Sequence, residues 1–252
     1  MNTTATMPVE IPASINRPCD DCGQLVASET IVVFGHDLTA GLPVCCETCF
    51  DAREKREIEQ QKKREAAKRE SEWERIVAKH YRATDVENPD FNSALWRALA
   101  HWSIDDGWLG IIGPAGHCKT RTLALLIRRH IFAGRPAEWT TASRFQWAAQ
   151  REFDDHEGPE ARRWLHRWKS TGLLIFDDLG KQRWTDTVES HFFDLVDTRL
   201  AHERPIWWTA NTHPEDMIAA KQLTKDRGAP IVGRLLEASR IVDLSIQQQL
   251  PL

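Results

Sequence analysis

The stretch that decides the fold runs from residue 113 to residue 120 and reads Gly113-Pro114-Ala115-Gly116-His117-Cys118-Lys119-Thr120. It departs once from the phosphate-binding pattern Gly-x-x-x-x-Gly-Lys-Ser/Thr, because Cys118 stands where the second glycine belongs. The apolar run 108–112 before it predicts a buried strand, and helical periodicity follows from Thr120 to Ala133. A strand, a glycine turn and a helix N-terminus together form the context that a phosphate-binding loop requires.

The residue types of this loop predict ATP and Mg²⁺ as ligands. Backbone N–H groups of the turn and the helix dipole would bind phosphate oxygens, while Lys119 would reach the β- and γ-phosphates. The Thr120 hydroxyl would hold Mg²⁺, and Arg121 completes the expected nucleotide-binding set, residues 113–121. A side chain at Cys118 leaves two outcomes open: the loop adjusts and binds ATP with some loss, or the site is disabled. The intact Lys119 and Thr120 favour the first outcome.

Acidic and amide side chains that follow two apolar runs predict the rest of an ATPase site. Asp177 and Asp178 come directly after the run 173–176, and we expect Asp177 to bind Mg²⁺ and Asp178 to orient or activate the attacking water. Asn211 follows the run 206–209 and is expected to hold that water against the γ-phosphate. The alternative for Asn211 is a turn that opens the next helix.

The chain from residue 107 onward alternates between strand and helix patterns, as an α/β fold with a parallel sheet does. The predicted strands after the first are 137–141, 173–176, 206–209 and 240–246, and the predicted helices are 142–153, 159–169, 187–201, 214–221 and 229–238. We therefore expect a parallel sheet flanked by helices.

Five of the six cysteines lie in the first fifty residues. Cys19 and Cys22 form one Cys-x-x-Cys pair, Cys46 and Cys49 form a second, and hairpin-like sequence joins them. This spacing predicts a tetrahedral site of four thiolates for Zn²⁺, and a redox dithiol is the alternative. Cys45 could replace Cys46 as a ligand. So short a segment buries little apolar surface, so zinc is expected to supply its folding energy.

The composition divides the chain into four parts: a flexible tail (1–16), the zinc-binding module (17–50), a charged helical linker (51–75) and the ATPase domain (76–252). The linker contains oppositely charged pairs at helical spacing, such as Glu59 and Lys63. The net charge is −4, and neither a signal peptide nor an apolar run of membrane-spanning length is present. A soluble cytoplasmic protein with no membrane partner is therefore expected.

The motifs of residues 105–246 resemble those of the DnaC/IstB group of AAA+ ATPases, the replicative-helicase loaders and transposition helper ATPases. The resemblance rests on four stretches, 113–120, 173–180, 209–211 and 231–237. It implies an AAA+ P-loop core, with Asn211 as the sensor residue and Arg234 as an arginine finger that acts on the neighbouring subunit. Cys118 is the clear departure from the family pattern.

The resemblance implies an ATP-dependent loader of a replicative helicase, which self-associates through its ATPase interface and binds single-stranded DNA. Four aromatic residues and five arginines between 144 and 168 are suited to that DNA, although helical spacing equally suits core packing; they are Phe145, Trp147, Trp164, Trp168, Arg144, Arg151, Arg162, Arg163 and Arg167. The alternatives are an IstB-like transposition helper, a non-hydrolysing ATP-gated adaptor, and a zinc-dependent DNA-binding regulator that keeps the ATPase fold as a scaffold.

Overall fold

The computed structural model describes residues 14–29, 32–33, 36–37, 42–219 and 225–245. Its contacts divide the chain into two compact units, Met1–Ala66 and Ala67–Leu252. Helix α1 (Glu47–Ile76) contributes residues to both units. The division falls inside the predicted linker. Residues 1–13 of the predicted tail lie outside the described residues, while its last three residues, 14–16, begin a strand and correct the prediction of a tail there.

The N-terminal unit contains two small antiparallel pairs of strands. Strands β1 (Ser14–Pro18) and β2 (Leu25–Glu29) pair with Pro18 opposite Leu25, and β3 (Val32–Val33) pairs with β4 (His36–Asp37). Only Cys19, Val44 and Cys46 are buried among its described residues. So small an apolar core leaves the unit in need of another source of folding energy.

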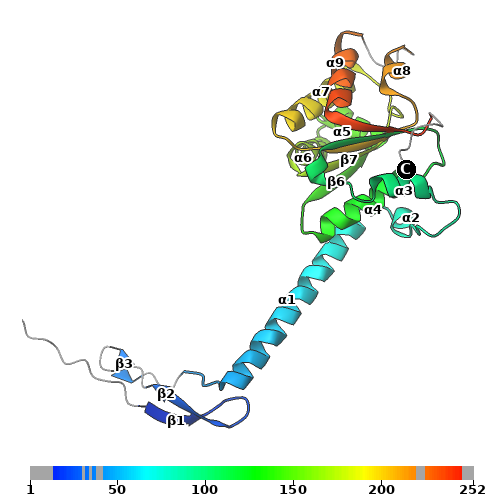
Figure 1. Cartoon of the computed structure of the whole chain (residues 1–252). Helices are drawn as coiled ribbons and strands as arrows, with labels where there is room; N and C mark the ends of the chain where they lie inside the picture. Colours follow the sequence, from blue (N-terminus) through cyan, green and yellow to red (C-terminus); the bar gives the residue numbers. More distant parts are fainter. Residues whose placement is uncertain (1–13, 30–31, 34–35, 38–41, 220–224, 246–252) are drawn as a thin grey trace, which may run out of the picture. The chain divides into compact units, whose positions relative to one another are not determined.

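The C-terminal unit is built around a parallel sheet of five strands (Figure 1). Its strands are β5 (Trp108–Ile112), β6 (Ala137–Thr141), β7 (Leu173–Leu179), β8 (Ile206–Ala210) and β9 (Ser239–Asp243). They lie in the order β6-β7-β8-β5-β9. The predicted α/β fold with a parallel sheet is confirmed.

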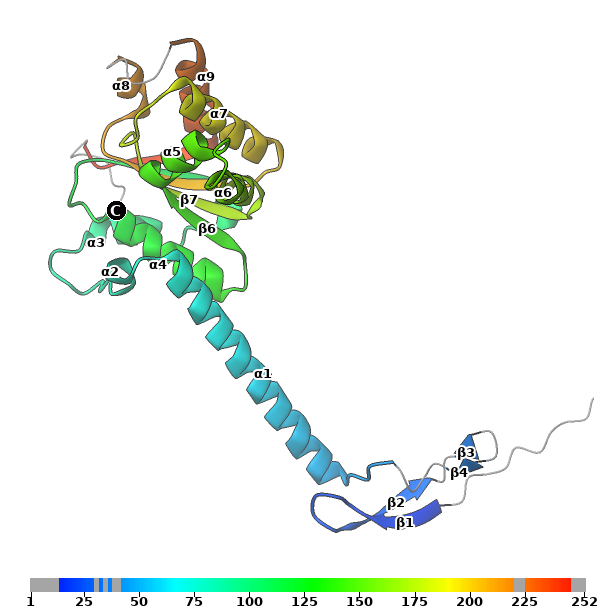
Figure 2. The same ribbon diagram turned by 180° about the vertical axis from the view of Figure 1, so that it is seen from behind.

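Helices cover both faces of this sheet (Figures 1 and 2). Helices α5 (Ala142–Arg151), α6 (Gly158–Ser170), α7 (Asp186–Ala201) and α9 (Lys225–Ala238) contribute to the core on one face, with α8 (Pro214–Ala219) beside α9. The end of α1, α3 (Ser93–Leu99) and α4 (Lys119–Phe132) contribute to the core on the other, and α2 (Lys79–Arg82) contacts α4. A short 3₁₀ helix, Ile104–Asp106, precedes β5.

The two cores explain the continuous apolar runs in the sequence. On β7, Leu174 and Phe176 pack in one core, while Leu173 and Ile175 pack in the other. A strand buried on both faces needs apolar side chains at every position. Such a sheet is expected of a parallel α/β core.

No helix of the described ranges is both long and apolar enough to cross a membrane.

Candidate nucleotide-binding and zinc sites

Three neighbouring strands bring the predicted ATPase residues to one edge of the sheet. Strand β8 lies between β5 and β7, and all three are parallel. Their carboxyl ends therefore place three segments side by side: the loop 113–118 after β5, Asn211 after β8, and the acids Asp177 and Asp178 in β7. In open parallel sheets this edge is where ligands bind.

The phosphate-loop backbone keeps the conformation that glycine would favour, even with a cysteine in place. Cys118 has φ 59° and ψ 19°, in the left-handed region, and stands immediately before the first residue of α4. Gly116 also has a positive φ of 85°. A non-glycine residue in this region costs about 1–2 kcal/mol. The Cys118 side chain is half-buried, with its Sγ 3.5 Å from the Asp90 carbonyl oxygen.

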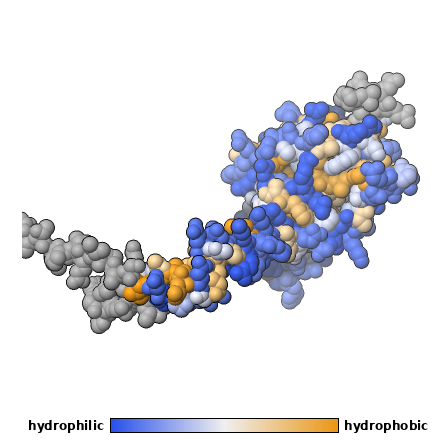
Figure 3. Space-filling model, turned by 60° about the horizontal axis from the view of Figure 1, so that its bottom comes forward, coloured by the Kyte–Doolittle hydropathy of each residue, from blue (hydrophilic) through white to orange (hydrophobic). Residues whose placement is uncertain are grey.

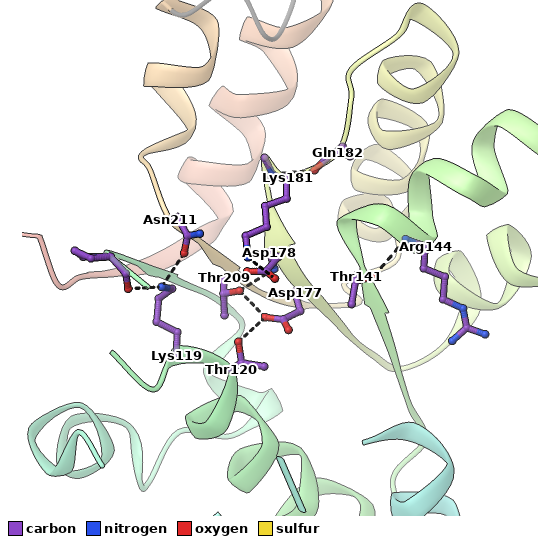
Figure 4. Close-up of polar contacts among 12 residues, drawn as sticks. Lys119, Thr120, Thr141, Arg144, Asp177, Asp178, Lys181, Gln182, Thr209 and Asn211 are labelled. Atoms are coloured by element: carbon purple, nitrogen blue, oxygen red, sulfur yellow. Dashed lines mark hydrogen bonds and ion pairs between the residues drawn. The ribbon is translucent and has the colours of Figure 1, made fainter. Parts of the chain in front are cut away.

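Lys119 points into the loop and is held by oxygen acceptors (Figure 4). Its Nζ donates to the carbonyl oxygens of Gly113 (2.7 Å) and Pro114 (2.8 Å) and to Asn211 Oδ1 (3.0 Å). The side chain is 6% exposed, and this burial lowers the pKa of Lys119. Lys119, predicted to reach the γ-phosphate, is therefore hydrogen-bonded to Asn211, predicted to hold the attacking water against that phosphate.

Asp177 lies beside the two hydroxyl groups of Thr120 and Thr209. Its Oδ1 accepts from Thr120 Oγ1 (2.9 Å) and from Thr209 Oγ1 (2.6 Å). The side chain is 2% exposed, and burial raises the pKa of Asp177. In the described part of the chain no lysine or arginine forms a salt bridge with this carboxylate.

This oxygen cluster fits Mg²⁺ in chemical type. Mg²⁺ prefers carboxylate and hydroxyl oxygens together with substrate phosphates, and a buried carboxylate without a cationic partner is costly. Thr120 and Asp177 are therefore the residues that would hold Mg²⁺. When bound, that ion would neutralise charge that develops on the phosphates.

Asp178 stands at an irregularity of β7. The pairing of β7 with β8 shifts between Phe176 and Leu179, and Asp178 takes a positive φ of 62°. Its backbone N–H donates to Thr209 Oγ1 (2.9 Å). This turns its carboxylate toward the cavity, where Oδ2 lies 2.9 Å from Lys181 Nζ.

Two adjoining cavities lie over this edge. The first, of about 240 Å³, is lined by residues 115–121 and by Tyr81, Asp178, Lys181 and Asn211. The second, of about 490 Å³, shares Cys118 and Arg121 with the first and is also lined by residues of the segment 80–91. Their combined space suits a nucleotide, with phosphates over the loop.

Three residues of this site have no role predicted from the sequence. Thr209 belongs to the stretch 209–211 on which the family resemblance rests, and its position at the end of a predicted strand could have indicated a role in the site. Lys181 follows the acidic pair by three residues. Tyr81, the only tyrosine in the chain, comes from a short helix with no motif to identify it.

Arg234 lies away from these cavities, on α9. Its Nε is 3.4 Å from Asp197 Oδ1, and its guanidinium stands over the Phe193 ring, 4.6 Å from the centroid. Both partners belong to α7. The role of Arg234 on a neighbouring subunit stays a prediction.

The aromatic residues and arginines between 144 and 168, considered above for DNA binding, lie partly in the core and partly at the surface. Phe145 and Trp168 are fully buried, which favours the core alternative for these two. Trp164 is half-buried, with the Arg144 guanidinium 3.9 Å and that of Arg167 5.1 Å from its ring centroid. Part of this region therefore packs inside, while Trp164 and its arginines remain at the surface.

The basic surface continues along α6. Five residues of this helix line a shallow hollow of about 760 Å³; they are Pro159, Arg162, Arg163, His166 and Arg167. Arginine side chains at a surface contact phosphate groups well, and an accessible indole face stacks on bases. DNA binding by this surface stays a prediction.

The cysteines of the N-terminal unit converge as the spacing predicted. The sulfur atoms of Cys19, Cys22, Cys46 and Cys49 all lie within 4.8 Å of one another. Cys45 is outside this set, with its Sγ 3.8 Å from Asp21 Oδ2, and forms a second group with Cys19 and Asp21; Cys46 as the fourth ligand stays a prediction, which the four-sulfur group favours.

The chemistry of this cluster fits zinc. Backbone N–H groups, chiefly that of Cys46, lower the pKa of Cys19 to about 6, whereas hydrogen bonds among the sulfur atoms, chiefly that with Cys46, raise the pKa of Cys49 in the metal-free cluster. Thiolate is the form that binds metal, and four thiolates suit tetrahedral Zn²⁺. The four cysteines are therefore the residues that would hold a zinc ion.

Comparison with known proteins supports the architecture. No protein-family model matches the chain, and no curated protein matches it. Among solved structures, a DNA replication initiation factor matches with a TM-score of 0.52 at 17% identity, over 68% of this chain and 51% of that one. DnaI matches with a TM-score of 0.51 at 18% identity, over 67% of this chain and 92% of that one. The C-terminal unit shares its fold with these two proteins.

These likenesses extend to the fold and no further, because the identities are low. This chain spans about half the length of the replication initiation factor. A DnaC helicase loader also matches, with a TM-score of 0.48 at 19% identity, over 66% of this chain and 99% of that one. The shared fold accounts for the convergence of strand ends described above, while activity and partners depend on the residues of the site.

Proposed function

We propose that this protein is an ATP-dependent loader of a replicative helicase onto single-stranded DNA. The observation that carries the proposal is the convergence of Lys119, Thr120, Asp177, Asp178 and Asn211 at one edge of an AAA+ sheet. Support for the replication context comes from the fold shared with DnaI and with a DNA replication initiation factor.

The site residues divide the work of hydrolysis. Lys119 and the loop N–H groups would bind the phosphates, with Lys119 exchanging its carbonyl acceptors for phosphate oxygens. Water would attack the γ-phosphorus, Asp178 would take its proton, and the bond to the β–γ bridging oxygen would break. Asn211 would orient the water beside Lys119, and Arg234 of a neighbouring subunit would stabilise the developing charge.

The remaining surfaces supply the partners of a loader. Trp164 with Arg144 and the basic face of α6 would bind single-stranded DNA. The N-terminal unit exposes Leu25 (67%) and Phe50 (59%), and Figure 3 shows hydrophobic residues grouped there. Exposed apolar groups of this kind suit contact with another protein, which we propose is the helicase.

The test is steady-state ATP hydrolysis by the full chain, with and without single-stranded DNA. We expect DNA to stimulate turnover and Asp178→Asn to reduce it at least about 100-fold, the scale of losing a general base. Asp194→Asn, an exposed acid on α7, is the matched control and should keep full activity. Capture of a replicative helicase, and not of a transposase, by the full chain would support the loader over a transposition helper.

One observation favours a second function, a non-hydrolysing ATP-gated adaptor. Cys118 places a side chain and a strained backbone directly beside the phosphate site. Tight ATP binding without turnover, in the presence of DNA and helicase, would establish the adaptor and overturn the hydrolytic loader.

A further inference from the structure

A second lysine faces the nucleotide cavity besides the lysine of the phosphate loop. Lys181 lines the same cavity as Lys119, and its Nζ lies 2.9 Å from Asp178 Oδ2. Figure 4 shows its side chain extending from the loop after β7 to Asp178. Lys181 is also near enough to Lys119 to add to the lowering of the pKa of Lys119, which is mainly due to burial. The cavity thus holds more positive charge than the loop alone provides.

The backbone of Lys181 is held by hydrogen bonds, while its side chain is largely exposed to solvent. Its N–H donates to the Asp178 carbonyl (3.1 Å), and the preceding Gly180 has a φ of 94° and donates to Gln182 Oε1 (2.8 Å). Gln182 is only 5% exposed, so it anchors this turn. The Lys181 side chain, in contrast, is 52% exposed. A long exposed side chain on a fixed turn exchanges partners at little cost in backbone order.

We propose that Lys181 is a phosphate-binding residue that pairs with Asp178 in the free protein and moves to the terminal phosphate of a bound nucleoside triphosphate. This inference rests on the proposed ATPase function and adds a regulatory step to the same site. A terminal phosphate carries more negative charge and more acceptor oxygens than one carboxylate, so it competes for the ammonium group.

The exchange has a consequence for Asp178. In the free protein the ion pair occupies the carboxylate that must accept a proton from water. Once Lys181 moves to the terminal phosphate, that carboxylate is free to bind the attacking water. A nucleoside diphosphate lacks the group that draws Lys181 away, so Asp178 stays paired. The terminal phosphate thereby frees Asp178, the residue that accepts the proton of the attacking water.

The experiment compares dissociation constants for a non-hydrolysable ATP analogue and for ADP by calorimetry, using the full chain. Lys181→Met should weaken the ATP analogue at least about 10-fold, the scale of one hydrogen bond to a charged group, and change ADP affinity less than about twofold. Lys181→Arg should retain most of the preference for ATP. Lys169→Met is the matched control, because Lys169 also pairs with an aspartate, Asp194, but on helices away from the cavity.

A double variant distinguishes a direct contact of Lys181 with the phosphate from an indirect effect, in which removing Lys181 leaves the charge of Asp178 without a partner. In Asp178→Asn, Lys181 has no competing carboxylate, so the ATP analogue should bind at least as tightly as in the wild type. Adding Lys181→Met to Asp178→Asn should then weaken the analogue about 10-fold. No loss in the double variant would show that Lys181 only neutralises Asp178, and would overturn the inference.

The outcomes also separate this inference from the proposed function. If the wild type hydrolyses ATP while Lys181→Met binds the analogue and ADP in the wild-type ratio, only the role of Lys181 fails. If the wild type binds neither nucleotide, the ATPase function and this inference fail together.

Discussion

Cys118 tests how much the phosphate loop depends on glycine at a left-handed position. The residue adopts φ 59° with its side chain against the Asp90 carbonyl oxygen. Glycine takes this conformation without the strain of a Cβ, which amounts to about 1–2 kcal/mol. We expect Cys118→Gly to bind ATP several-fold more tightly and to gain up to about 1 kcal/mol in free energy of unfolding, measured by calorimetry and chemical denaturation.

Cys118→Ala separates the backbone from the thiol. It keeps the Cβ and loses the Sγ contact with Asp90, so it should bind ATP no better than the wild type if backbone strain is the cause. Weaker ATP binding by Cys118→Gly than by the wild type would show that the thiol contributes to the site and that the strain argument is wrong.

The sequence alone identified the side chains that follow the strands in the nucleotide site. The residues that those side chains contact could be identified only from the structure. A glycine-rich turn followed by Lys119 and an acidic pair after an apolar run are local patterns, so both were visible in the sequence. The Lys181–Asp178 pair depends on a turn fixed by Gln182, and Tyr81 reaches the cavity from nearly forty residues before Lys119. Contacts of this kind depend on tertiary packing, which no local pattern encodes.

At the scale of elements, the strands and helices of the C-terminal unit followed their hydrophobic patterns closely. The strand predicted at 137–141 is β6, and the helix predicted at 187–201 is α7 within one residue. Arg199 shows what the pattern missed. It is fully buried in α7 and donates to four carbonyl oxygens, those of Trp168, Thr171, Gly172 and Pro205. An arginine near the end of a helix normally indicates a solvated position.

The junction of α4 and β6 contains a buried histidine that makes the stability of this unit depend on pH. His130 is 7% exposed, with its Nε2 3.3 Å from the Pro136 carbonyl oxygen. Burial lowers the pKa of His130 below its usual 6.5; the hydrogen bond with the Pro136 carbonyl and nearby Asp105 oppose this effect, and Arg135 adds to it. The unfolded chain therefore binds a proton more readily, so stability from neutral His130 is complete above about pH 6.5 and lost as the pH falls below it.

His130→Gln keeps a hydrogen-bond donor and cannot titrate. Between pH 7 and pH 5.5 we expect its melting temperature to fall less than that of the wild type, by about 2–4 °C for a domain of this size. His166→Gln, on the exposed side of α6, is the control and should follow the wild type. Parallel curves for all three proteins, recorded by calorimetry, would rule out His130 as the source of the acid sensitivity.

At the scale of the whole molecule, the two units draw their stability from different sources. The C-terminal unit has two apolar cores, one on each face of its sheet, and the described N-terminal unit buries only three side chains, two of them cysteines. We therefore expect zinc removal by a chelator to unfold the N-terminal unit and expose it to proteolysis. ATP binding by the C-terminal unit should persist, because its cores contain no zinc ligand.

Two neighbouring cysteines provide a matched test of the metal site. Cys46 belongs to the cluster of four sulfur atoms, and Cys45 lies outside it beside Asp21. Cys46→Ser should lose the single zinc ion, measured by metal analysis of the purified chain, while Cys45→Ser should retain it. The Cys46→Ser protein should also lose helicase capture and keep ATP binding, since we place the partner surface on the N-terminal unit. Equal zinc loss in both variants would contradict the assignment of Cys46, and helicase capture by the metal-free chain would move the docking surface to the C-terminal unit.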